Sequence, residues 1–278
     1  MTEPPPVPRT EPKYPGLYAD STVAGTALAT RGLLKRFGTT VAVASIDMDV
    51  PTGSFFGLVG PNGAGKTTTL SMVTGLLRPD GGRAFIAGYD VWQDPVEAKR
   101  RMGVLPDGLR LFERLSGREL LTYLGRFRGM PVDQVVSRAD ELLQVLDLYE
   151  AGGKLVADYS TGMRKKITLA AALLHSPPVL LLDEPLEAVD PVSARVIRTV
   201  LTRYTAGGGT VIFSSHVMAL VEELCTHVGV MAAGRIVALG TLAEVRGTSA
   251  SLDDAFMHIV GADDRGSGGL EWLRSSQA

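Results

Sequence analysis

The chain has 278 residues, a formal net charge of −2 and one cysteine, Cys225. Hydrophobic residues make up 45% and charged residues 21%, as in a globular protein with a sizeable core, and the near-neutral charge gives no electrostatic argument for nucleic-acid binding. A single cysteine excludes an intramolecular disulfide framework and a cysteine-cluster metal site, and the apolar neighbours of Cys225 predict a small buried hydrophobe.

No apolar run reaches the roughly 18 to 20 residues of a membrane span, and the N-terminal segment lacks the pattern of a secretory signal. We therefore expect a cytoplasmic protein that reaches a membrane only through a partner. Residues 1–24 are predicted to be a disordered proline-rich tail, and 263–278 a polar C-terminal tail. The basic runs 99–101 and 164–166 are interpreted as solvated helix faces rather than nucleic-acid contacts.

Two or three strands are predicted before the first helix. Residues 27–34 are strand-like. The next run, 41–50, alternates between two faces, one of which carries Ala42, Ala44, Ile46 and Met48. A turn at 51–53 leads into Phe55–Val59, a short apolar run of strand type.

The nine residues after this strand contain the strongest motif of the chain, G-x-x-x-x-G-K-[ST]. In such a loop, placed between a strand and a helix predicted over 67–74, the backbone N–H groups converge on an anion at the positive end of the helix. Lys66 can then reach the outer phosphates of a nucleotide, and the Thr67 hydroxyl is placed for Mg²⁺. The alternative is a glycine-rich loop with a surface lysine. It is disfavoured because every fixed position of the motif is matched, and because a strand precedes and a helix follows the loop as the motif requires. The residues of this predicted phosphate-binding loop are Gly60, Pro61, Asn62, Gly63, Ala64, Gly65, Lys66, Thr67 and Thr68.

A short strand is predicted over 83–87, and residues 115–175 then read as almost wholly helical. Ser116 and Glu119 form a capping-box pattern at the start of a helix. We interpret about 112–176 as a helical subdomain inserted in an α/β core. The buried face predicted for its second helix is Val135, Val136, Ala139, Leu142, Leu143 and Leu146.

The α/β pattern returns at 179–182, an apolar run expected for a central parallel strand. Asp190 is predicted to cap the next helix, and Ser215 to open another after a strand over 210–213. The buried face predicted for the helix after Asp190 is Val192, Val196, Ile197, Val200, Leu201 and Tyr204. The last predicted elements are strands at 227–231 and 235–239, a capping box at Thr241 and Glu244, and a helix over 251–260.

Polar side chains are predicted to gather at the carboxyl ends of the parallel strands, where open α/β sheets bind ligands. Asp183 and Glu184 follow the strand at 179–182, so Asp183 can hold Mg²⁺ through water while Glu184 orients or deprotonates an attacking water. His216 follows another strand and can hydrogen-bond a γ-phosphate. The alternatives are an acidic turn and a histidine of no special role, which fit only if these residues are considered apart from the phosphate-binding loop.

Together with these motifs, Tyr159-Ser160-Thr161-Gly162-Met163 is similar to the signature motif of ATP-binding cassette (ABC) proteins, and residues 27–260 resemble the nucleotide-binding subunit of an ABC transporter. The resemblance implies an α/β fold of the P-loop NTPase, ABC ATPase type over residues 25–262. Such a fold has a mainly parallel sheet, an antiparallel β region and an inserted helical subdomain. The resemblance also implies Mg²⁺-dependent ATP hydrolysis that drives a separate integral-membrane permease from the cytoplasmic face of the membrane.

The resemblance carries over to single residues. Phe37 matches the aromatic residue that stacks on adenine, and Asp107 lies where the family usually has a Gln or Glu near the metal. Lys66, Glu184 and His216 match catalytic positions. In the family the signature contacts the γ-phosphate held by another subunit, so Ser160 and Gly162 would complete the site of a homodimer or of a pair with a closely related ATPase subunit. The ending Leu252–Phe256 resembles that of single-cassette exporter ATPases.

Three positions depart from the family pattern. Asp107 is shorter than Gln and charged, Thr161 replaces the first signature glycine, and Glu187-Ala188-Val189 differs from the usual small residues before Asp190. None of these changes removes a phosphate-, Mg²⁺- or water-activating group, so we expect hydrolysis. Two alternatives stay open. One is a non-transport ABC ATPase acting on ribosomes or DNA, a class that usually has two cassettes or long coiled-coil arms, and the other is a regulatory nucleotide-binding module that no longer hydrolyses ATP.

Overall fold

The computed structural model describes residues 23, 25–108 and 111–260. The N-terminal tail predicted over 1–24, apart from Val23, and the C-terminal tail predicted over 263–278 lie outside the described residues. Among the helices that the structure describes, none is long and apolar enough to cross a membrane.

A four-stranded antiparallel sheet is built by the N-terminal part of the chain, in the order β2-β1-β4-β5. Its strands are β1 (Thr26–Phe37), β2 (Thr40–Pro51), β4 (Gly81–Ile86) and β5 (Tyr89–Asp90). The alternation predicted along β2 is interrupted at Ser45, whose φ of 57° marks an irregularity in the pairing with β1. Val43 is buried on one side of this break, while Ile46 and Met48 are buried on the other, so the predicted two-face alternation is wrong as one continuous pattern.

A six-stranded sheet forms the centre of the molecule, in the order β10-β9-β3-β8-β7-β6. Its strands are β3 (Phe55–Val59), β6 (Met102–Leu105), β7 (Val179–Leu182), β8 (Thr210–Ser215), β9 (His227–Ala232) and β10 (Arg235–Thr241). All neighbouring pairs are parallel except β9 with β10. The carboxyl ends of β3, β7 and β8 therefore lie at one edge of the sheet.

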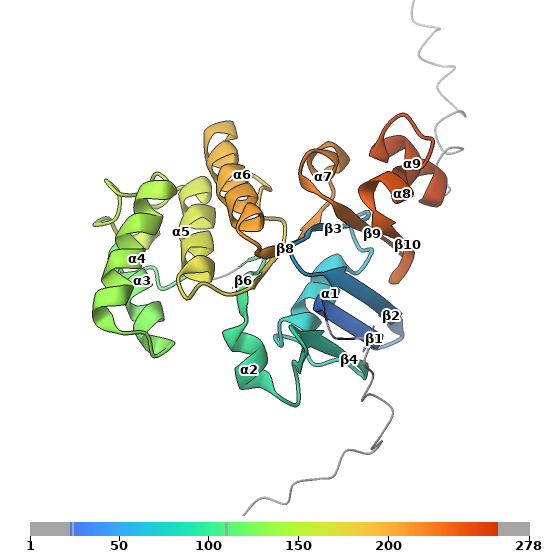
Figure 1. The fold of residues 1–278 in the computed structure, drawn as a ribbon, viewed down its shortest axis with the longest axis horizontal. Helices are drawn as coiled ribbons and strands as arrows, with labels where there is room; N and C mark the ends of the chain where they lie inside the picture. The colour runs from blue at the N-terminus through green and yellow to red at the C-terminus, as the bar shows by residue number, and fades with distance from the viewer. Residues whose placement is uncertain (1–22, 24, 109–110, 261–278) are drawn as a thin grey trace, which may run out of the picture.

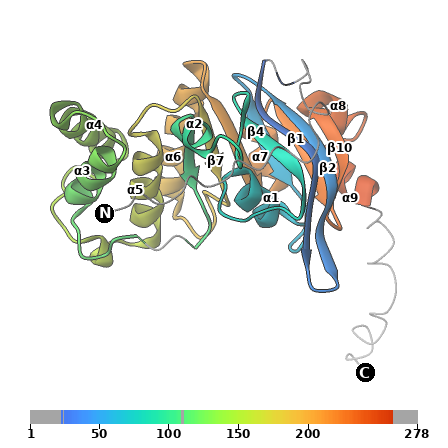
Figure 2. The same ribbon diagram turned by 90° about the horizontal axis from the view of Figure 1, so that it is seen from below.

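The helices gather on both sides of this sheet (Figures 1 and 2). The predicted helical stretch contains α3 (Gly117–Phe127), α4 (Val132–Val145), a 3₁₀ helix (Val156–Asp158) and α5 (Thr161–Leu173), which lie together at one end of the molecule. The capping box at Ser116 and Glu119 is confirmed. The other helices are α1 (Lys66–Val73), α2 (Pro95–Arg100), α6 (Pro191–Ala206), α7 (Met218–Leu224), α8 (Leu242–Arg246) and α9 (Leu252–Val260).

Two apolar cores cover the two faces of the six-stranded sheet. One lies between the sheets and includes Phe56 of β3 and Leu181 of β7, and the other includes Leu180 and Leu182 and packs against α3, α5 and α6. The side chains of β7 are buried on both faces of the sheet, which explains why this strand is apolar at every position rather than alternating. On the second face, β6 and α5 approach so closely at Gly103 that a Cβ there would lie 2.2 Å from the Ala172 carbonyl oxygen.

Several predictions of burial are wrong. Val136 on α4 is 44% exposed and Val192 on α6 is 70% exposed, because neighbouring elements cover a narrower stripe of each helix than the sequence pattern covers. The predicted solvated face at 164–166 fails at Lys166, which is buried and donates to the Asp147 carbonyl at 3.1 Å.

The predicted start of a helix at Ser215 is also wrong. Ser215 is the last residue of β8, and α7 begins at Met218. The Ser215 hydroxyl accepts a hydrogen bond from the Val217 N–H at 3.0 Å, so it closes the connecting turn rather than capping the helix. In contrast, the prediction for Cys225 is confirmed: the thiol is buried, and burial raises its pKa well above the ordinary value.

Candidate nucleotide-binding site

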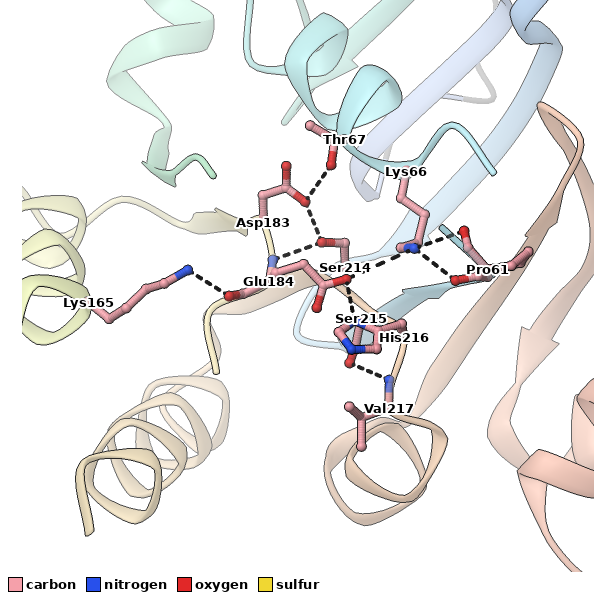
Figure 3. Close-up of polar contacts among 11 residues, drawn as sticks. Pro61, Lys66, Thr67, Lys165, Asp183, Glu184, Ser214, Ser215, His216 and Val217 are labelled. Carbon is pink, nitrogen blue, oxygen red and sulfur yellow. Dashed lines mark hydrogen bonds and ion pairs between the residues drawn. The ribbon is translucent and has the colours of Figure 1, made fainter. Parts of the chain in front are cut away.

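The phosphate-binding loop connects the carboxyl end of β3 to α1. Gly65, the residue before the helix, has a φ of 104°, and a Cβ at this position would lie 2.5 Å from the Ala42 carbonyl oxygen. Glycine is therefore required both by the backbone conformation and by the close neighbour. Lys66 folds back over the loop, where its buried ammonium donates to the carbonyl oxygens of Gly60 at 2.8 Å and Pro61 at 3.3 Å (Figure 3).

The parallel register explains why residues far apart in sequence meet at this loop. Leu182 pairs with Phe213, so Asp183 follows beside Ser214. Val59 pairs with Ser215, so the first loop residue follows beside His216. The same strand edge thus collects the phosphate-binding loop, the acidic pair and the histidine.

A cavity of about 260 Å³ opens between these segments. Its walls come from the loop, from the acidic segment after β7, from the start of the segment after β8 and from the segment after β6. The lining residues are Ala42, Asn62, Gly63, Ala64, Gly65, Lys66, Thr67, Thr68, Asp107, Glu184, Glu187 and His216.

Asp183 lies beside this cavity and is buried. One of its carboxylate oxygens, Oδ1, accepts hydrogen bonds from the Ser214 hydroxyl at 2.5 Å and from the Thr67 hydroxyl at 3.3 Å. Two oxygen donors, Thr67 and Asp183, therefore lie next to each other at the start of α1. Hard oxygen donors of this kind suit Mg²⁺, which keeps its other coordination positions for water and phosphate oxygens. Within the described residues, no group of three or more His, Cys, Asp and Glu side chains could hold a metal ion by itself.

Glu184 occupies a backbone conformation that non-glycine residues rarely adopt, with a φ of 43°. Its N–H donates to the Ser214 hydroxyl at 2.9 Å, and its C=O accepts from the Lys165 ammonium at 2.8 Å. The carboxylate turns toward the loop: Oε1 lies 3.1 Å from His216 Nδ1 and 4.0 Å from Lys66 Nζ (Figure 3). A carboxylate in this position can accept a proton from a water that faces a phosphate.

Comparison with known proteins agrees with this geometry. Residues 43–187 match the model of a family described as ABC transporter. The daunorubicin resistance ATP-binding protein DrrA3 of Streptomyces coeruleorubidus is 38% identical over 224 residues, which cover 81% of this chain and 71% of DrrA3. The chain belongs to the ABC transporter family.

Further similarities lie within the same family. The linearmycin resistance ATP-binding protein LnrL of Bacillus subtilis is 35% identical, over 77% of this chain and 69% of LnrL. A solved structure of an ATP-binding subunit of an ABC transporter superposes with a TM-score of 0.79 at 28% identity, and the match covers 84% of this chain and 100% of that chain. The predicted family and fold class are thus confirmed, and the chain is an ATP-binding, ATP-hydrolysing subunit of an ABC transporter.

The structure also locates the remaining positions that match ABC motifs. Asp107 is exposed after β6 and lines the cavity. Phe37 ends β1 and is 52% exposed, with Lys35 Nζ 5.6 Å from the centre of its ring. Ser160 is exposed at the N-cap of α5, where its hydroxyl accepts from the Met163 N–H at 3.3 Å.

Gly162 lies in the first turn of α5 and packs against the start of α6. A Cβ on Gly162 would lie 2.7 Å from Asp190 Oδ2 and 2.8 Å from Ser193 Oγ. Neither Ser160 nor Gly162 is among the described residues that line the cavity. The ABC signature therefore lies outside the cavity formed by the phosphate-binding loop of its own chain.

Two residues of the site escaped the sequence prediction. Ser214 bonds both Asp183 and Glu184, and the only sequence signal for it is a polar residue near the end of an otherwise apolar strand. Lys165 bonds the Glu184 carbonyl across the gap between α5 and the end of β7. No local signal identifies Lys165, because its role depends on how the helical part packs against the sheet.

Proposed function

We propose that this ABC ATPase subunit pairs with a second ATPase subunit when Mg²⁺-ATP is bound. The pair then hydrolyses ATP to drive export through a separate integral-membrane permease. We further propose that residues 25–262 form the ATPase domain and that about 112–176 form its helical subdomain. The observation that carries the proposal is the convergence of Lys66, Thr67 and Glu184 around one open cavity. Asp183 is hydrogen-bonded to Thr67 beside it, and the signature residues lie outside it.

Lys66 and the loop backbone are proposed to bind the phosphates. In the structure the Lys66 ammonium donates to carbonyl oxygens of its own loop, and phosphate oxygens are stronger acceptors for a cation. Thr67 and Asp183 are proposed to hold Mg²⁺, in part through water, because their oxygens lie 3.3 Å apart. When bound, Mg²⁺ would neutralise charge on the phosphate oxygens.

Glu184 is proposed to activate the attacking water, and His216 to contact the γ-phosphate. The 3.1 Å contact between the two side chains would orient the carboxylate before ATP arrives. Positioning and charge neutralisation are the main requirements of phosphoryl transfer, and these residues supply both. Asp107, which lines the same cavity, is proposed to lie near the metal, and Phe37 is proposed to stack on adenine.

The second half of the site is proposed to come from another ATPase subunit, either a second copy or a close relative. Support comes from the position of Ser160 and Gly162, which lie at the N-terminus of α5, where a helix favours an anion, yet outside the cavity of their own chain. Export is supported by relatives whose names state resistance or export, among them the Nod factor export ATP-binding protein I of Cupriavidus metallidurans, 38% identical over 77% of this chain and 70% of that protein. The proposed location is the cytoplasmic face of the membrane, through the permease.

The test is the composition of the working complex. Tagged chain would be purified from native membranes with Mg²⁺-ATP, and the masses of its components would be measured. We expect a membrane-spanning permease together with two ATPase chains. For the isolated chain, the Glu184→Gln variant should pair with its own copy or with the second ATPase chain when Mg²⁺-ATP is added, and addition of EDTA should separate the pair. A Glu150→Gln variant, changed at an exposed position, serves as the control. An ATP-hydrolysing complex with a single ATPase chain would contradict the proposal.

A further inference from the structure

The backbone of Glu184 is held from both sides by side chains of other elements. On the amino side, its N–H donates to the Ser214 hydroxyl of β8 at 2.9 Å. On the carbonyl side, its C=O accepts from the Lys165 ammonium of α5 at 2.8 Å. A φ of 43° is unfavourable for a residue with a Cβ, so this conformation persists only if the surroundings enforce it. These two hydrogen bonds, together with a longer one that the Glu184 C=O accepts from the Glu187 N–H at 3.3 Å, are the described contacts that do so.

Lys165 connects the group of helices α3, α4 and α5 to the segment that follows the central strand β7. It lies on α5, at the end of the molecule formed by α3, α4 and α5, whereas Glu184 follows the central strand β7 (Figures 1 and 3). Lys165 lies five positions after the signature serine, Ser160, which corresponds to roughly 7.5 Å along a helix axis. The same short segment of α5 thus carries the signature at its N-terminus and the lysine that holds Glu184.

The conformation of Glu184 determines where its carboxylate points. With the backbone held, Oε1 lies 3.1 Å from His216 Nδ1 and 4.0 Å from Lys66 Nζ, at the wall of the cavity. With the N–H held by Ser214, a relaxation of φ would turn the carbonyl group and the side chain of Glu184 together about the N–Cα bond, and the carbonyl oxygen would lose its contact with Lys165. The carboxylate would then leave the position from which it faces the phosphate-binding loop.

We propose that Lys165 is a positioning residue for ATP hydrolysis, which fixes the Glu184 backbone from α5 and so holds the carboxylate in its working direction. The proposal rests on the proposed role of Glu184 in activating water. Lys165 is not among the described residues that line the cavity, so it acts through Glu184 rather than on the nucleotide. Because Lys165 and the signature share one segment of α5, a movement of α5 on assembly would change the Glu184 geometry directly.

The experiment compares the Lys165→Met and Lys165→Arg variants, with Lys154→Met as a matched control. Lys154 is an exposed lysine of the same helical region. Phosphate release is measured against ATP concentration, and nucleotide affinity separately. A hydrogen bond from a charged donor typically shifts an equilibrium by about 10-fold or more. If the Glu184 backbone leaves its working conformation to that extent, Lys165→Met should lower kcat about 10-fold and leave KM within about 2-fold. Arginine can also donate to a carbonyl, so Lys165→Arg should keep at least about half of kcat, and Lys154→Met should match the wild type.

A double variant separates this proposal from the proposed role of Glu184. If Lys165 acts through the Glu184 carboxylate, adding Lys165→Met to Glu184→Gln should leave the low single-turnover rate of Glu184→Gln unchanged within about 2-fold. An additive loss would overturn the proposal, as would an unchanged kcat in Lys165→Met or an equal loss of kcat in Lys165→Arg. Wild-type turnover in Glu184→Gln alone would instead overturn the proposed function of Glu184, whatever the Lys165 variants do.

Discussion

Replacing Ser214 with alanine tests the hydrogen-bond network under the proposed catalytic segment. Ser214 is fully buried; its hydroxyl donates to Asp183 Oδ1 at 2.5 Å and accepts from the Glu184 N–H at 2.9 Å. Ser214→Ala removes a bond to a carboxylate, a class of bond that contributes about 1.5–3 kcal/mol, and leaves the Glu184 N–H without this partner, which costs about 1–3 kcal/mol. Because the two losses share one site and neighbours relax, we expect a decrease of about 2–4 kcal/mol in the free energy of unfolding.

The assay combines thermal unfolding with phosphate release. For a chain of this size, about 2–4 kcal/mol corresponds to an unfolding midpoint lower by roughly 3–7 °C. Turnover should fall because the Glu184 backbone loses the hydrogen bond that holds its N–H. The matched control is Ser215→Ala. The neighbouring hydroxyl is also buried, but among the described residues it accepts only from the Val217 N–H, at 3.0 Å. Its loss should cost about 1 kcal/mol of stability with little change in turnover. Equal unfolding midpoints and equal turnover in the two variants would refute the reasoning.

Two further predictions concern stability. Gly103→Ala would place a Cβ 2.2 Å from the Ala172 backbone oxygen, so α5 and β6 must move apart. We expect the free energy of unfolding, measured in urea, to fall by about 1–3 kcal/mol. An unchanged urea midpoint would show that α5 and β6 can separate at no cost. Burial, with the nearby Arg128 charge, lowers the pKa of His175 from its usual 6.5 to about 4, so between these pH values the unfolded chain binds a proton that the folded chain does not. Stability should therefore fall as pH drops through this window, and the unfolding midpoint of His175→Gln should fall less between pH 7 and 5 than that of the wild type; equal decreases would contradict this assignment.

Much of the fold could be predicted from the sequence because the decisive signals are local. The run Phe55–Val59 is buried at every position and was recognisable by its uniform apolarity, and the capping boxes at Ser116 and Thr241 depend only on residues three apart. The phosphate-binding loop is similarly local, because glycine positions and a following helix determine its shape. These elements lie where the sequence predicted them.

The features that escaped prediction depend on contacts between distant segments. Val192 fits the apolar stripe of α6 but is 70% exposed, since none of the residues that the structure describes covers its side at the start of that helix. Lys165 and Lys166 look alike in sequence, yet one bonds the Glu184 carbonyl and the other is buried against Asp147. The short helix α2 was expected only through the solvated basic face at 99–101. Its bounds were not predicted, because six residues are too few for a clear period.

The most direct test of the account is the single-turnover rate of phosphate release by Glu184→Gln at saturating Mg²⁺-ATP, beside wild-type protein. Glutamine keeps the size of the side chain and removes the proton-accepting carboxylate, and loss of a general base lowers rates by about 100-fold to 10,000-fold. The account predicts a loss of at least about 100-fold with nucleotide affinity retained. A Glu184→Gln rate within about 2-fold of the wild type would contradict the claim that this carboxylate activates the water.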